Sequence, residues 1–152
     1  MTARGVDFLL LCRAGTRLCG LPSQHVLETL RPLPVQPLAG APEHVLGLVL
    51  IRGIAQPVVD LARLLGEEQA QITRYVTIAL NGRRVALAVG QVLGIRALAR
   101  DALQALPPLL RQAGQETIAA LGSLDAELLL VLDGARLVPP DTLQAQAAEP
   151  VA

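Results

Sequence analysis

Short apolar stretches, separated by glycine, proline and asparagine, follow one another through most of the chain. Each stretch has the length and composition of a strand. Pro22 and the prolines between residues 32 and 37 mark loops or sheet edges, because proline cannot donate a hydrogen bond to a ladder. The pattern predicts an all-β protein with about ten strands, over residues 6–14, 17–21, 26–30, 46–51, 54–59, 75–80, 83–89, 92–98, 117–121 and 128–132.

Two of the turns indicate β-hairpins. Gly15-Thr16 suits a type II′ turn, and Asn81-Gly82 is the strongest short hairpin signal that a sequence carries. The helices are expected to be short. Residues 60–65 and 101–106 each begin with an aspartate that can cap a helix, and residues 141–152 are expected to form a C-terminal helix or a loose tail.

The chain contains an internal repeat. Residues 58–65 and 131–138 share five of eight identities, and the two hairpins superpose with Gly15 on Gly82, which places Phe8 on Tyr75. We therefore predict one domain over residues 1–140, with a first barrel over 6–70 and a pseudo-symmetric second barrel over 71–138. Such barrels avoid the exposed edges that endanger all-β chains.

The composition argues against two classes of function, nucleic-acid binding and membrane insertion. Lys plus Arg and Asp plus Glu both number 13, so the net charge is zero and gives no pull toward phosphate or anionic lipid. Only two aromatic residues are present, whereas a nucleic-acid-binding barrel needs stacking aromatics and a basic groove. The sequence shows no signal peptide, and no apolar run approaches the roughly 18 residues of a membrane span. We expect a cytoplasmic protein without membrane insertion.

Few residues are candidates for chemistry. Across a two-residue turn Cys12 faces Cys19, and we expect both thiols to point inward with Phe8, reduced rather than joined in a disulfide. His25 and His44 could be proposed as zinc ligands with these cysteines, but the spacing fits no compact zinc template. Phosphate loops, nucleophile elbows and paired carboxylates are lacking too, so we predict no enzyme, metal or cofactor.

Residues 47–61 resemble the central signature of the CheW family of chemotaxis proteins, and several further motifs agree with it in order and spacing. The resemblance extends over about residues 6–139. The matching positions are Gly47, Arg52, Gly53, Pro57, Val58, Asp60 and Leu61 in the signature, Val26 and Glu28 before it, and Val89, Val92 and residues 129–137 after it.

The resemblance implies two five-stranded SH3- or OB-like barrels around a shared core. It also implies a non-catalytic adaptor that couples the cytoplasmic tip of methyl-accepting chemoreceptors to the regulatory domain of a CheA-type histidine kinase. The alternatives are a scaffold for a specialised, non-flagellar complex and a small nucleic-acid-binding barrel. The first is suggested by departures from the family pattern: Leu50 for asparagine, Ala62 for arginine, Cys19 for an aromatic residue and Gly90 for aspartate.

The residues expected to bind partners are Arg52, Gly47, Leu50, Gly53, Val26 and Glu28. A guanidinium at a strand end suits bidentate contact with a partner, although Arg52 could also be a solvated turn residue. Gly47 could admit a partner backbone, and Gly53 is expected to supply an unusual φ. Glu28 is either a polar contact or a solvated edge residue. Asp60 is expected to cap a helix.

Overall fold

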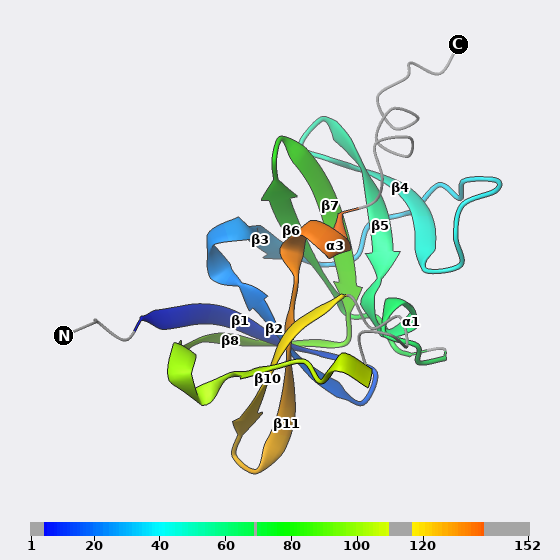
Figure 1. The fold of residues 1–152 in the computed structure, drawn as a ribbon. Helices are drawn as coiled ribbons and strands as arrows, with labels where there is room; N and C mark the ends of the chain where they lie inside the picture. Colours follow the sequence, from blue (N-terminus) through cyan, green and yellow to red (C-terminus); the bar gives the residue numbers. More distant parts are fainter. Residues whose placement is uncertain (1–4, 69, 110–116, 139–152) are drawn as a thin grey trace.

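The computed structural model describes residues 5–68, 70–109 and 117–138, which form two β-sheets (Figure 1). The β1 sheet has six strands in the order β8-β1-β2-β11-β10-β9, and the β6 sheet has five in the order β3-β6-β7-β5-β4. The elements are β1 (Val6–Ala14), β2 (Arg17–Pro22), the 3-10 turn η1 (Ser23–His25), β3 (Val26–Leu30), β4 (Val45–Ile51), β5 (Ile54–Asp60), α1 (Leu61–Leu64), β6 (Arg74–Leu80), β7 (Arg83–Val89), β8 (Gln91–Ala99), the 3-10 turn η2 (Arg100–Ala102), β9 (Gln104–Ala105), β10 (Ile118–Leu124), β11 (Glu127–Leu132) and α3 (Gly134–Leu137).

The predicted all-β class is confirmed, and each predicted strand occurs with small shifts at its ends. The predicted cap is also present, because the Asp60 carboxylate accepts a hydrogen bond from the Arg63 amide at the start of α1. The helix predicted over 101–106 is wrong. That stretch holds the end of η2 and then β9, whose pairing with β10 outweighs a weak local helix preference. The helix or tail predicted over 141–152 lies outside the described residues.

The two halves of the chain exchange strands. The β1–β2 hairpin pairs with β8 and β11 from the second half, and the β6–β7 hairpin pairs with β3 and β5 from the first. Each sheet therefore combines a hairpin from one half with strands from the other, so the sheets do not follow the division predicted near residue 70. A repeat shows which segments resemble each other, but it does not show which of the equivalent edges pair.

The register of the repeat differs by one residue from the predicted one. Both hairpins have two-residue tips, residues 15–16 in the first and residues 81–82 in the second, and these tips occupy equivalent positions. Tyr75 therefore superposes on Leu9, and the predicted match of Tyr75 with Phe8 is wrong. The consequence is large, because a shift of one residue moves a side chain to the other face of a sheet.

The strands in the middle of each sheet bury both faces. On β1, Leu10 and Cys12 enter a core that both sheets share, whereas Leu9 and Leu11 enter a separate core inside the β1 sheet. The β6 sheet is built in the same way around its own inner core. Burial on both faces explains why the strands have nearly continuous apolar sequences instead of alternating ones.

Each sheet closes on itself through the chain that follows its edge strand. After β3, Gln36 exchanges two main-chain hydrogen bonds of 2.8 Å with Leu48 on β4, the opposite edge of the β6 sheet. After β8, β9 pairs with β10 in the β1 sheet. The prediction of two pseudo-symmetric barrels around a shared core is thus confirmed, with β9 as a sixth strand in the β1 sheet.

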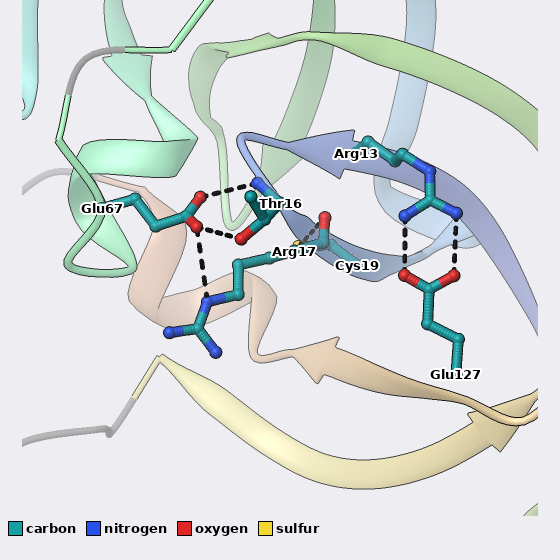
Figure 2. A network of polar contacts seen from close by, with 6 residues as sticks. All are labelled: Arg13, Thr16, Arg17, Cys19, Glu67 and Glu127. Carbon is teal, nitrogen blue, oxygen red and sulfur yellow. Dashed lines mark hydrogen bonds and ion pairs between the residues drawn. The ribbon is translucent and has the colours of Figure 1, made fainter.

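Ion pairs tie the first hairpin to its surroundings (Figure 2). The Glu67 carboxylate, just beyond α1, accepts hydrogen bonds from the Thr16 amide at 2.9 Å and from the Thr16 hydroxyl, and it lies 3.8 Å from Arg17 Nε. Arg13 donates two hydrogen bonds of 2.7 and 2.8 Å to Glu127 at the start of β11. The first contact joins the tip of a β1-sheet hairpin to the segment that follows β5 and α1 of the other sheet.

Because the two sheets share a core, we expect them to unfold together. Leu87→Ala, at a fully buried position of that core, should lower the free energy of unfolding by about 2–5 kcal/mol. Urea titration followed by circular dichroism and by Tyr75 fluorescence should show one coincident transition. The exposed Leu128→Ala is the control and should stay within about 0.5 kcal/mol. Two separate transitions would contradict a shared core.

Candidate functional site

The tip of the β4–β5 hairpin carries the first candidate residue. Ile51 pairs with Ile54, and the two residues between them have positive φ angles, 50° at Arg52 and 79° at Gly53. This pattern is that of a type I′ turn. Glycine adopts it freely, as predicted for Gly53, but a side chain in this region costs on the order of 1–3 kcal/mol. Arg52 is therefore held in a strained conformation at the end of the paired β4–β5 hairpin.

Arg52 forms a bidentate ion pair with Glu28. Its Nε donates to Glu28 Oε2 at 2.9 Å and its Nη2 donates to Glu28 Oε1 at 3.0 Å. Glu28 lies on β3, and the pair joins the two opposite edges of the β6 sheet. The arginine side chain is 77% exposed, and its other N–H donors are not used by Glu28. The guanidinium is thus oriented by one contact and open to another.

The ion pair also sets the protonation of both groups. Hydrogen bonds from Arg52 lower the pKa of the Glu28 carboxyl, and the carboxylate in turn raises the pKa of Arg52. Both groups are therefore charged over the whole neutral range. Charge-assisted bidentate pairs fix geometry more strongly than neutral hydrogen bonds do.

Two residues close to Arg52 in the sequence carry exposed apolar side chains, on opposite faces of the hairpin. Leu50 on β4 is 66% exposed, and Ile54 at the start of β5 is also exposed. We call Glu28, Leu50, Arg52, Gly53 and Ile54 the tip surface. It combines a fixed charge with exposed aliphatic groups, a combination that suits protein recognition.

Two of the predicted residues are not part of the tip surface. A side chain at Gly47 would collide with the main chain of Gln36, so this glycine admits a segment of its own chain. Its φ of 145° and the bulge between Val45 and Gly47 mark the same close approach. Val26 is half-buried and packs against the shared core.

The equivalent position in the β1 sheet lacks this ion pair. Asp125 occupies the place of Arg52 at the β10–β11 tip, and Gly94 occupies the place of Glu28. The charge at the tip is reversed and the partner side chain is missing. A cavity of about 170 Å³ lies there, lined in part by Gly94 and Asp125. The pseudo-symmetry of the fold therefore does not extend to the site.

A second surface was missed in the sequence. The β1–β8 pairing continues beyond the equivalent β3–β6 pairing, as far as Val6 and Ala99, and forms a projecting ribbon (Figure 1). Val6, Phe8 and Ile95 are exposed on the face of this ribbon that carries Leu10. We call these three residues the ribbon surface. The prediction that Phe8 points inward is wrong, because the ribbon extends past the shared core and leaves Phe8 58% exposed.

The cysteines lie as the two-residue turn predicts. Cys12 and Cys19 are directly opposite each other on β1 and β2, both fully buried and both free. A hydrogen bond with Cys19, together with burial, raises the pKa of the Cys12 thiol. A buried thiol with a raised pKa is a poor nucleophile, so the pair belongs to the core packing.

Two features are absent from the part of the chain that the structure describes. In residues 5–68, 70–109 and 117–138, no three His, Cys, Asp or Glu side chains come together as a metal site. None of the helices in these same ranges has the length and hydrophobicity of a membrane span.

Two closed sheets around a shared core, with an exposed charged hairpin tip, define a double-barrel β-protein suited to binding other proteins. A family model for the CheW-like domain matches residues 9–140, so the chain belongs to the CheW-like domain family. It is 37% identical to Protein FrzA of Myxococcus xanthus over 100 residues, which cover 63% of this chain and 61% of FrzA. The chain thus spans less than two thirds of that relative.

A solved structure shows the same fold. The scaffolding protein TtCheW from Thermoanaerobacter tengcongensis superposes with a TM-score of 0.74 at 17% identity, over 85% of this chain and 90% of TtCheW. The family membership agrees with the resemblance seen in the sequence.

The ion pair predicts a pH dependence with a definite sign. Because Arg52 lowers the folded-state pKa of Glu28, the pair stabilises the fold above the ordinary carboxyl pKa, and this stabilisation is lost as the pH falls through the folded-state pKa. Carboxyl NMR titration should therefore give a low pKa for Glu28, which rises in Arg52→Ala. Glu127 is the control, because its pKa is lowered by Arg13 and should not change. An unchanged Glu28 pKa would mean that the pair does not form in solution.

Because both cysteine thiols are buried, we expect them to be modified slowly in the folded protein. Folded protein should react with a thiol-specific disulfide reagent only as fast as the fold opens, because both sulfurs are inaccessible and the Cys12 pKa is raised. Rates measured with increasing urea should follow unfolding. Rapid modification of one thiol in the absence of denaturant would show that the hairpin opens locally.

Proposed function

We propose that this protein is a non-catalytic adaptor of a chemosensory array, which couples the cytoplasmic tip of chemoreceptors to the regulatory domain of a CheA-type histidine kinase. Membership of the CheW-like domain family supports an adaptor role, and the observation that carries the proposal is the tip surface. Its exposed arginine is oriented by Glu28 and stands at a positive φ on the turn of the paired β4–β5 hairpin. Strained residues held by their surroundings occur preferentially at functional sites.

An adaptor must hold two partners at once, and the protein has two separate surfaces that can do so. The tip surface lies on β3 and the β4–β5 hairpin, whereas the ribbon surface lies on β1 and β8 of the other sheet. We propose that the tip surface binds one partner and that the ribbon surface binds the other. In this proposal the shared core between the sheets holds the two binding surfaces in a fixed relative position.

A specialised chemosensory system is the second candidate. The similarity to FrzA favours it, and so does Leu50, an exposed leucine at the place of the family's asparagine. A partner that meets this surface would lose a polar contact at Leu50 and gain an apolar one. Such a change alters the preferred partner without altering the adaptor role. The protein is expected to act in the cytoplasm, at receptor arrays.

Arg52→Ala tests the proposal directly. Loss of a charge-assisted hydrogen bond, worth about 1.5–3 kcal/mol, should weaken binding to the kinase regulatory domain or to the receptor tip about ten- to a hundredfold. The free energy of unfolding should change by less than about 1 kcal/mol, because an exposed ion pair contributes little. Isothermal titration calorimetry with each purified partner, together with urea unfolding, measures both quantities.

Arg96→Ala is the matched control, since it removes an equally charged side chain from an exposed position of β8 in the other sheet. It should leave the affinity of the tip-surface partner unchanged. If both variants bind both partners as tightly as the natural chain does, Arg52 is a solvated turn residue and the tip surface is not the contact.

A further inference from the structure

The inner core of the β6 sheet contains polar side chains where the β1 sheet has leucine. The superposition of the two hairpin tips places Thr77 on Leu11, and the strand partners of these two residues, Glu28 and Gly94, are equivalent as well. Three pairs of equivalent buried positions differ in this way between the two sheets. The equivalent pairs are Tyr75 and Leu9, Thr77 and Leu11, and Gln56 and Leu129.

Each of the three polar side chains donates to a main-chain carbonyl, and two of these carbonyls belong to residues of the tip surface. The Thr77 hydroxyl donates to the carbonyl of Glu28 itself at 3.3 Å. Gln56 Nε2 donates to the carbonyl of Ile54, the residue that follows the Arg52-Gly53 turn, at 3.4 Å. The Tyr75 hydroxyl donates at 3.2 Å to Leu33, in the loop that leaves β3.

These contacts are not needed for the barrel itself. The β1 sheet closes with leucines at the same three positions, so apolar packing is sufficient for the fold. Gln56 also carries a penalty, because its Oε1 is buried and has no hydrogen-bond partner in the described part of the chain. An unsatisfied buried acceptor destabilises a protein. Residues that lower stability without serving the fold are expected at functional sites.

We propose that Gln56, Thr77 and Tyr75 are positioning residues for the tip surface: they hold the main chain of the β4–β5 tip, of β3 and of the loop that leaves β3, so that Glu28 and Arg52 meet in the bidentate geometry. This inference rests on the proposed function for its binding readout. The ion pair joins two opposite edges of a sheet, so a small shift of either edge separates its atoms. In the β1 sheet Gly94 and Asp125 form no such pair. The leucine side chains at the three equivalent positions cannot donate hydrogen bonds to the main chain.

Gln56→Met tests the proposal, with Leu129→Met as the matched control at the equivalent position. Methionine has nearly the volume of either residue and lacks the amide. The first readout needs no partner: the Glu28 pKa, measured by carboxyl NMR, should rise in Gln56→Met and stay low in Leu129→Met. Melting temperature should be maintained or raised in Gln56→Met, because the unpaired acceptor is gone.

The second readout is affinity for the partner of the tip surface. Gln56→Met should weaken binding about two- to tenfold, the range of one neutral hydrogen bond, and Thr77→Val should do the same. A positioning residue acts through Arg52, so Gln56→Met should have no further effect in an Arg52→Ala background. Additive losses would overturn the proposal, because they would mean that Gln56 acts on the partner independently.

The two readouts separate this inference from the proposed function. If Gln56→Met leaves both the Glu28 pKa and partner affinity at their natural values, the positioning role is wrong. If neither the kinase domain nor the receptor tip binds even the natural chain, but Gln56→Met still raises the Glu28 pKa, the positioning role stands and the proposed function fails.

Discussion

The whole structure depends on the core that lies between the two sheets. The strands that form this core are apolar on both faces. One face packs in the shared core, and the other packs in the inner core of the strand's own sheet. Neither face can be left in water, so each sheet needs the other. The exchange of strands between the two halves of the chain has the same effect, since each sheet is completed by segments from both halves. The result is one unit in which distant hairpin tips keep fixed positions.

The two sheets have a similar arrangement of strands but different side chains at several equivalent positions. Equivalent hairpin tips hold an arginine in one sheet and an aspartate in the other, and equivalent edge positions hold a glutamate and a glycine. The inner cores differ too, with buried Tyr75, Thr77 and Gln56 in the β6 sheet and leucines at the equivalent positions of the β1 sheet. A duplicated unit preserves the positions that pack, because both copies must fold. Positions that serve a partner are free to differ.

The energies involved suit a reversible adaptor. The Glu28–Arg52 pair is exposed and contributes little to folding, and the strain at Arg52 is small beside the burial of the shared core. The ion pair instead fixes the orientation of Arg52. A guanidinium that is already held by two hydrogen bonds loses less conformational entropy when a partner binds. Exposed Leu50 and the ribbon surface offer apolar area on two different sheets. The arrangement suits reversible binding of another protein.

The sequence by itself determined the all-β class, the strands, both hairpins and the motif that contains Arg52, because these depend on local preferences and on residue patterns. It also brought Cys12 opposite Cys19, since a two-residue turn sets the register. Only the tertiary structure decided which edges pair, that Phe8 is exposed, that Gly47 meets Gln36, and that Glu28 meets Arg52. These features join segments far apart in the chain, and closure of a sheet brings together edges whose meeting no local pattern encodes.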